Sequence, residues 1–202
     1  MSTLTATPPD EPTDPKRRQL LIATSVAGAA AGAAIAIPLL SSMAPSARAR
    51  AAGAPVEVDI STLQPGEMIT VQWRGKPVWI IHRSPEMMQA LKAAEPFLVD
   101  PHSERPQQPS YATNDYRSIK PEIMVAIGIC THLGCSPTEK FKHGSAEGMS
   151  ANWPGGFFCP CHGSKFDLAG RVFKNVPAPT NLVVPPYKYL TDTRLLIGDD
   201  KA

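Results

Sequence analysis

The chain has 202 residues, of which 43% are apolar and 6% aromatic, so one compact domain with an extension is expected rather than two large domains. Residues 1–55 hold five basic and three acidic residues, whereas residues 56–202 hold fifteen of each. A neutral body without a basic patch argues against nucleic-acid binding, which needs positive charge to displace counterions. Fifteen of the 22 prolines follow Pro55. They argue against a helical bundle and predict a mainly β domain with many loops.

The N-terminal extension contains an uncharged apolar run over residues 20–40. As a helix, this run would span about 31 Å, which matches a hydrocarbon core of about 30 Å. It is longer than the about 7–15 apolar residues of a cleaved secretory signal, so a retained anchor is favoured over a signal peptide cut near residues 46–49. Lys16, Arg17 and Arg18 precede the run and predict a cytoplasmic N-terminus with the body on the other side of the membrane.

The pair Arg17-Arg18 resembles a twin-arginine export signal, a route that carries proteins already folded around a cofactor. The Ala-rich and Ser-rich stretch after the apolar run offers nothing to a core and predicts a flexible tether. The predicted domains are a cytoplasmic tail with the export signal at 1–19, a transmembrane helix at 20–40, the tether at 41–55 and a compact head at 56–202.

Three short segments of the head have the alternating or apolar pattern of strands. They cover residues 56–60, 68–73 and 78–82, and turn-forming Pro and Gly residues separate them. We predict that they form an antiparallel meander.

A helix is predicted over residues 87–94, because Ser84 can cap it and Pro85 suits its first turn. Residues 100–120 are mostly polar and predict a long surface loop. Three histidines have no Cys or His at metal-ligand spacing and are interpreted as surface or structural residues. They are His82, His102 and His143.

All four cysteines lie within residues 130–161, beside two histidines. The first group, C-T-H-L-G-C at 130–135, follows an apolar strand predicted over residues 123–129. The second group, C-P-C-H-G-S at 159–164, follows the apolar residues 155–158. Both groups are expected on loops that leave strand ends, where the backbone can hold a metal.

Three interpretations of these six side chains compete. A structural zinc site takes four ligands and favours C-x2-C pairs, so it leaves two residues unexplained. Two plain disulfides suit an exported protein but leave the paired Cys and His placement to chance. A two-iron, two-sulfide cluster with two thiolates on one iron and two imidazoles on the other accounts for both residue types.

At this point the chain resembles the Rieske iron–sulfur proteins, whose paired motifs C-T-H-x-G-C and C-P-C-H-G-S match both groups without a gap. The resemblance implies an antiparallel Rieske-type head domain with an inserted cluster-binding subdomain at about 128–180 and one [2Fe-2S] cluster. The implied ligands are Cys130, His132, Cys159 and His162. The implied disulfide joins Cys135 to Cys161.

The resemblance extends to the Rieske subunits of proteobacterial cytochrome bc complexes, which share the twin arginine, the anchor and the tether. It implies a loop that shields the cluster, formed here by Pro177, Ala178 and Pro179, with Val176 where Gly is commoner. It also implies that the Ser164 hydroxyl donates to a cluster sulfur. The family's second donor is a Tyr hydroxyl, and Phe166 replaces it here, which predicts a lower reduction potential. Further residues expected to shape the cluster environment are Leu133, Gly134 and Gly163.

Neutral imidazoles in place of two thiolates raise the reduction potential of such a cluster into the range of about −150 to +300 mV, which suits a quinol donor. An added electron also favours the protonated ring. By resemblance, His162 meets ubiquinol, and His132 is the second exposed ring. The head would then swing on residues 41–55 and deliver the electron to a membrane-bound c-type cytochrome. The implied partners are cytochrome b and that cytochrome, in a dimeric complex of the bacterial inner membrane.

Other Rieske functions fit less well. An oxygenase needs a second iron site with two His and a carboxylate, and the remaining histidines are scattered. The small Rieske subunit of an exported molybdenum oxidase, such as arsenite oxidase, stays as an alternative because it also carries a twin-arginine signal. A zinc-stapled interaction domain would be colourless and redox-silent.

Overall fold

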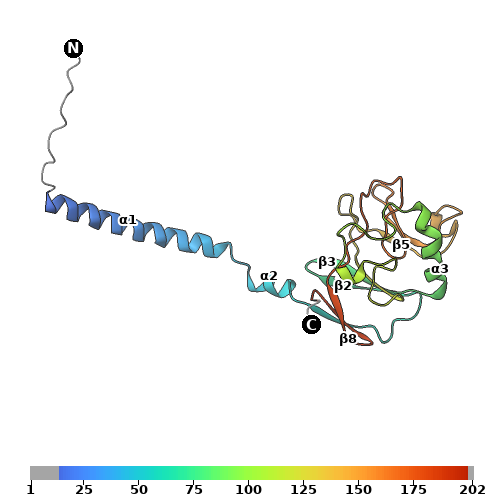
Figure 1. Cartoon of the computed structure of the whole chain (residues 1–202). Helices are drawn as coiled ribbons and strands as arrows, with labels where there is room; N and C mark the ends of the chain where they lie inside the picture. The colour runs from blue at the N-terminus through green and yellow to red at the C-terminus, as the bar shows by residue number, and fades with distance from the viewer. Residues whose placement is uncertain (1–13, 200–202) are drawn as a thin grey trace, which may run out of the picture. The chain divides into compact units, whose positions relative to one another are not determined.

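The computed structural model describes residues 14–199, which belong to two compact units that divide after Arg48 (Figure 1). The N-terminal unit is one helix, α1 (Pro15–Ser42), whose first turn is capped by the Asp14 carboxylate, which accepts from Lys16 N–H at 2.9 Å. The helix begins before the predicted anchor because Asp14 caps it and Pro15 suits its first position. Arg17 and Arg18 therefore lie within its first turns.

Among the described residues of their own unit, the apolar side chains of α1 have nothing to pack against. No residue of the helix is buried, and its Leu, Ile and Val side chains are 55–68% exposed. Among the described residues, this is the one helix that is long and apolar enough to cross a membrane. An exposed apolar helix of this length is the form that a bilayer accepts, because it satisfies its own backbone hydrogen bonds.

The segment predicted as a flexible coil contains a short helix, α2 (Ala47–Ala52). Its sequence, A-R-A-R-A-A, consists of two residue types with high helix propensity. The prediction of a flexible coil did not take this propensity into account. A six-residue helix is still marginal in water without tertiary contacts.

Three antiparallel three-stranded sheets form the second unit, which confirms the expected mainly β fold. The first sheet, in the order β1-β9-β8, joins β1 (Val56–Asp59) to β9 (Arg194–Ile197) and β8 (Tyr187–Thr191). The second, in the order β2-β3-β4, consists of β2 (Met68–Trp73), β3 (Lys76–His82) and β4 (Ile123–Ile127). The third, in the order β5-β6-β7, consists of β5 (Thr138–Lys140), β6 (Gly156–Phe158) and β7 (Lys165–Phe166).

The predicted meander is correct for β2 and β3 and wrong for β1. The β2–β3 hairpin pairs Val71 with Val78, but β1 pairs with the C-terminal strand β9, with Val58 opposite Leu195. The sequence pattern identified each strand, but the partner of β1 lies more than 130 residues further along the chain. Short-range turn signals cannot reveal such a pairing.

The central sheet is buried on both faces. Along β3, Val78 and Ile80 enter one core cluster with β1, β8 and β9, while Trp79 and Ile81 enter a second cluster with the third sheet. The Trp79 ring stacks on Phe157 of β6 with centroids 4.5 Å apart. This alternation explains the continuous apolar run of β3, and it attaches the third sheet to the rest of the head.

Helix α3 (Pro85–Ala94) is confirmed, with Ser84 as its N-cap accepting from Met87 N–H at 3.3 Å. It packs on Leu168 and Ala169, which follow β7. The helix therefore supports the segment that leaves the third sheet.

The prediction of a surface loop over residues 100–120 is wrong near its C-terminal end. The Arg117 side chain is fully buried and donates to the backbone oxygens of Ala169, Gly170 and Leu182 at 2.6–3.3 Å. Burial lowers the pKa of Arg117 to about 10, so the guanidinium stays charged at neutral pH. Backbone carbonyls and the Gln108 side chain accept from the two terminal nitrogens of the buried cation, an arrangement that hydropathy alone does not anticipate. Arg117 thereby ties together two stretches that flank residues 171–181.

A second buried cation, Arg171, closes the turn after β7. Its Nε donates to Asp167 at 2.8 Å, and the same carboxylate accepts from the backbone N–H groups of Ala169 and Arg171. Both charged side chains are almost completely buried. The pair fixes the path of the chain between β7 and the following loop.

Candidate functional site

The two Cys/His motifs lie on loops at strand ends, as predicted. Cys130 follows β4 by three residues, and Cys159 directly follows β6. Each loop is closed by an equivalent backbone hydrogen bond. Cys130 N–H donates to Cys135 O at 2.7 Å, and Cys159 N–H donates to Ser164 O at 2.8 Å. The loops are therefore two copies of one local structure.

Each loop turns at a glycine in the left-handed region. Gly134 has φ +85° and donates to Cys130 O, and Gly163 has φ +78° and donates to Cys159 O. A side chain at either position would be strained in this backbone conformation. The two loops have the same spacing between the first Cys and the Gly, as this shared turn requires, and the turn sets the direction of the side chains between them.

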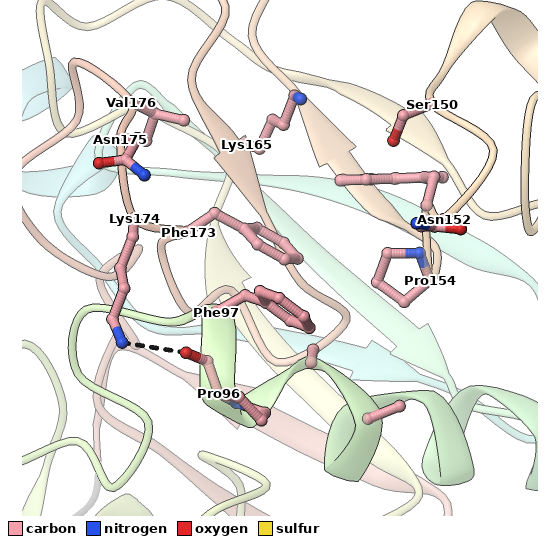
Figure 2. A pocket seen from close by; sticks show the side chains of 13 residues that line it. Pro96, Phe97, Ser150, Asn152, Pro154, Lys165, Phe173, Lys174, Asn175 and Val176 are labelled. Atoms are coloured by element: carbon pink, nitrogen blue, oxygen red, sulfur yellow. Dashed lines mark hydrogen bonds between the residues drawn. The ribbon is translucent and has the colours of Figure 1, made fainter.

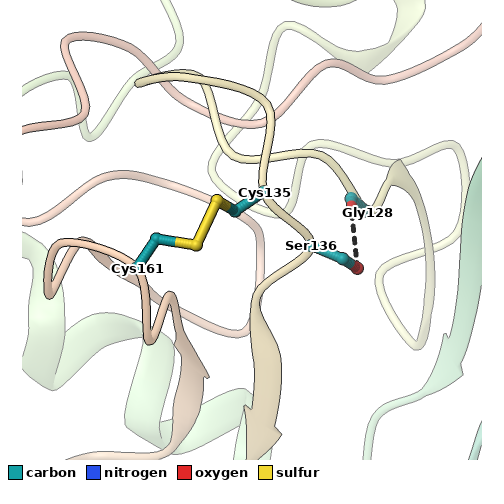
Figure 3. Close-up of a disulfide and its surroundings, with 4 residues drawn as sticks. All are labelled: Gly128, Cys135, Ser136 and Cys161. Carbon is teal, nitrogen blue, oxygen red and sulfur yellow. Dashed lines mark hydrogen bonds between the residues drawn. A yellow bond between two sulfur atoms is a disulfide. The ribbon is translucent and has the colours of Figure 1, made fainter.

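A disulfide between Cys135 and Cys161 joins the two loops (Figure 3). The Cα atoms of the pair lie 6.7 Å apart. Beside it, the Ser136 hydroxyl donates to Gly128 O at 3.0 Å, which holds the exit of the first loop. The pairing expected from the resemblance is the one that the structure contains.

The two remaining cysteines, Cys130 and Cys159, are free and only 2% exposed. Burial raises the pKa of the Cys159 thiol, and the adjacent Cys130 thiol raises it further. The backbone N–H groups of Cys161 and His162 oppose that rise because they hydrogen-bond to the sulfur. Two buried thiols side by side are costly to ionise without a cation, so this pair is suited to a bound metal.

Three cysteine sulfurs lie close together, but these three cannot form the metal site. The Sγ atoms of Cys135, Cys159 and Cys161 all lie within 4.8 Å of one another. Two of these sulfurs are bonded to each other, so they cannot act as thiolate ligands. The trio shows instead that the disulfide lies directly against the free thiol of Cys159.

The two imidazole rings of the motifs meet at the surface. The centroids of His132 and His162 lie 4.8 Å apart with perpendicular planes. His132 is half-buried, and His162 is exposed. The site thus has two buried sulfur donors on one side and two accessible nitrogen donors on the other. This donor set fits a two-iron cluster that has thiolates on one iron and imidazoles on the other.

The loop of Pro177, Ala178 and Pro179 packs against both motif loops. Ala178 N–H donates to the Ser164 hydroxyl oxygen at 3.0 Å, and the Thr131 hydroxyl donates to Thr180 O at 2.7 Å. Arg105 holds the outer side by donating to Pro179 O at 2.6 Å. The loop therefore covers the donor set from a third direction.

Ser164 is fully buried, and its oxygen accepts from Ala178, so the hydroxyl hydrogen is available to donate to another acceptor. Phe166 is fully buried two residues later and contributes no donor. Leu133 is 71% exposed at the tip of the first loop, next to the imidazole of His132 in sequence. These placements agree with the roles expected of the three positions, and they leave those roles as predictions.

The three histidines outside the motifs stay away from the donor set. The His82 Nδ1 lies 2.8 Å from Leu63 O, and His102 pairs with Asp115 at 3.0 Å. The hydrogen bond with Asp115 raises the pKa of His102. His143 is exposed on the loop after β5. The structural or surface interpretation of His82, His102 and His143 agrees with these contacts.

Sequence reasoning missed the residues that hold the shielding loop in place. They are Thr131, Arg105, Arg117, Asp167, Arg171 and Asn181. The Asp-x-x-Gly-Arg pattern at 167–171 is a turn signal that would have identified the Asp167 turn. The buried arginines have no comparable signal, because their acceptors are backbone oxygens from distant segments.

The chain is similar to known proteins along most of its length. The family described as "Rieske [2Fe-2S] domain" matches residues 107–188, and the family described as "Ubiquitinol-cytochrome C reductase Fe-S subunit TAT signal" matches residues 7–46. The ubiquinol-cytochrome c reductase iron-sulfur subunit of Allochromatium vinosum is 63% identical over 92% of this chain and 89% of its own length. The chain belongs to the ubiquinol-cytochrome c reductase iron-sulfur subunits.

A second relative, the iron-sulfur subunit from Blastochloris viridis, is 44% identical over 91% of this chain and 92% of its own length. Among solved structures, a chain of a hyperthermophilic respiratory Complex III has 27% sequence identity and a TM-score of 0.45. It covers 86% of this chain and 97% of that one. The family expected from the two Rieske motifs is thus confirmed.

Proposed function

We propose that this Rieske subunit transfers electrons from ubiquinol to a c-type cytochrome within a quinol–cytochrome c reductase. The main observation behind this proposal is the pair of equivalent loops. Together they present two buried thiols and two surface imidazoles, and one disulfide joins them. Membership of the iron-sulfur subunit family supports the same assignment.

Cys130 and Cys159 are proposed to hold one iron of a [2Fe-2S] cluster, and His132 and His162 the other. When bound, the cluster takes up and releases one electron. The backbone N–H groups directed at Cys159 stabilise its thiolate form. The buried Ser164 hydroxyl is free to donate to a cluster sulfur, and the loop over Ala178 excludes water from that side.

His162 is proposed to receive the hydrogen bond and the proton of ubiquinol, because it is the exposed ring of the pair. An imidazole has one ring nitrogen for a metal and one for a proton, so a single ring can join the two. A proton taken from ubiquinol would be held on the ring nitrogen of His162 that does not bind iron. His132, which is half-buried beside His162, is proposed as the second imidazole ligand.

The proposed partners are cytochrome b and a membrane-bound c-type cytochrome in a dimeric complex. Leu133 and the exposed Pro177 and Pro179 place apolar surface around the two imidazoles. Such a surface suits a docking face that excludes water from the proton transfer. The proposed location is the bacterial inner membrane, with α1 as a single-pass anchor, the N-terminus in the cytoplasm and the head in the periplasm.

The function is tested on the full chain in its complex. Dithionite reduction is expected to produce the EPR signal of a [2Fe-2S] centre, and the complex is expected to reduce cytochrome c with ubiquinol but not with arsenite. Over the pH range in which reduction of the cluster is accompanied by uptake of one proton, the reduction potential is expected to fall by about 59 mV per pH unit. A complex that oxidises arsenite and not ubiquinol would favour the molybdenum-oxidase alternative.

Phe166→Tyr is expected to raise the reduction potential of the cluster. The new hydroxyl can donate to a cluster sulfur, and a hydrogen bond to a charged group contributes about 1.5–3 kcal/mol, equivalent to about 60–130 mV for one electron. Phe166 lies fully buried on β7, so the added oxygen must find a partner. The measurement is a redox titration followed by visible circular dichroism. Phe166→Leu, which adds no donor, serves as the control, and an unchanged potential in Phe166→Tyr would refute the idea.

A further inference from the structure

A pocket of about 480 Å³ lies on the head domain, and neither imidazole of the two motifs is among its lining residues (Figure 2). Its volume lies within the about 300–1,000 Å³ of small-molecule sites. Phe97, Trp153 and Phe173 form its aromatic walls. The Trp153 and Phe173 rings lie 5.5 Å apart, and Trp153 is held by a hydrogen bond from its Nε1 to Lys140 O at 2.8 Å. The Trp153–Phe173 wall is therefore preformed, whereas the Phe97 side chain opposite is 62% exposed.

The charge on the pocket wall is positive. Among the described residues that line it, Lys165 and Lys174 are the charged ones, and none carries a carboxylate. Lys174 Nζ donates to Pro96 O at 2.9 Å, which leaves two further N–H groups of the ammonium (Figure 2). Within residues 14–199, Lys165 forms no ion pair. An occupant with a negative charge complements this wall.

The pocket is continuous with the segments that surround the cluster site. Lys165 directly follows Ser164, and its backbone oxygen accepts from Phe173 N–H at 3.1 Å. Lys174 N–H in turn donates to Phe97 O at 2.8 Å. At the other end, Val176 precedes the shielding loop. One hydrogen-bonded ladder thus connects the pocket to both the second motif loop and the shielding loop.

We propose that this pocket binds a small organic anion that carries a flat aromatic ring. The ring packs between Phe97 and the Trp153–Phe173 pair, and the carboxylate or comparable group pairs with Lys165. Lys174, whose ammonium lies on the other side of the aromatic rings in Figure 2, adds to the positive charge of the wall. Bound there, the negative charge lies beside the residue that follows Ser164, so it lowers the reduction potential of the cluster. Binding is independent of the proposed electron transfer, whereas the effect on the potential rests on it.

The test uses the full chain with its cluster in detergent, labelled with 5-fluorotryptophan, and 2-naphthoate as the probe. The chain has three tryptophans, so ¹⁹F NMR gives three signals, and Trp153→Phe assigns the one from the pocket. Saturable movement of the Trp153 signal, with the Trp73 and Trp79 signals unmoved, is the expected result. No saturable shift, or equal shifts of all three signals, would overturn the site.

The charge requirement is tested with Lys165→Met combined with Lys174→Met. This pair of substitutions keeps the aliphatic stems and is expected to weaken 2-naphthoate binding about tenfold, the loss that corresponds to about 1.4 kcal/mol. Binding of uncharged 2-naphthylmethanol should not change. Lys142→Met, on an exposed residue outside the pocket, is the matched control. Equal weakening in the control, or none in the double variant, would contradict the anion.

The link to the cluster is tested by a redox titration of the unaltered chain with saturating 2-naphthoate. A downward shift is expected, and at a 2-naphthoate concentration equal to the Kd of the unaltered chain the shift should be several-fold smaller in the double lysine variant. Saturable binding without any shift would overturn the link while leaving the binding site intact, because the NMR signal of Trp153 does not depend on electron transfer.

Discussion

Cys135→Ser combined with Cys161→Ser is expected to abolish stable cluster binding. The disulfide is the covalent connection between the two motif loops, which are separated by 26 residues in the sequence. Removing such a bridge from a small domain costs about 2–5 kcal/mol, and here the loss is concentrated on the loops that carry all four proposed ligands. Once the loops separate, water reaches Cys130 and Cys159, which are 2% exposed in the intact site.

Iron and acid-labile sulfide per chain, together with visible circular dichroism, measure this loss. Ser136→Ala is the matched control, because it removes one hydrogen bond beside the disulfide, to Gly128 O, at a cost of about 0.5–1.5 kcal/mol. The control is expected to keep its cluster. Full cluster content and an unchanged potential in the double cysteine variant would show that backbone closure of the loops is sufficient.

Deletion of residues 47–52 is expected to stop electron transfer to the cytochrome while leaving the cluster spectrum intact. The deletion removes about 20 Å of extended chain, at about 3.3–3.6 Å per residue, from the segment proposed as the tether. In the structure these residues form α2, which occupies about 9 Å at about 1.5 Å per residue. Because a helix of six residues is marginal in water, it can unfold, and the extended chain then lengthens the tether by the difference between these two lengths.

Two replacements of the same six residues separate reach from flexibility. A Gly-Ser hexapeptide keeps the length and remains flexible, so ubiquinol–cytochrome c turnover is expected to persist. Six prolines keep the length in a stiff extended form, and turnover is expected to fall. Normal turnover in the deletion variant would eliminate the swinging step, whereas loss of turnover in the Gly-Ser variant would assign a specific role to α2 itself.

Local features of the site were predictable because short sequence motifs determine them. The positions of Cys130 and Cys159 at strand ends, the disulfide partners and the shielding loop at 177–179 followed from two hexapeptides and the resemblance they carry. Likewise, Ser84 and Pro85 predicted the start of α3 through capping chemistry alone. Such features depend on residues a few positions apart, whose interactions are nearly independent of the rest of the fold.

Short-range patterns in the chain were sufficient to predict the class of metal site, the apolar anchor and five of the nine strands in the described residues. The pairing of β1 with β9, the burial of Arg117 in a mostly polar segment and the aromatic pocket next to Lys165 became evident only from the folded structure. These features depend on acceptors and surfaces contributed by residues far apart in the chain. Hydrophobic periodicity records which side chains are buried, but it does not record which distant backbone atom meets a buried charge.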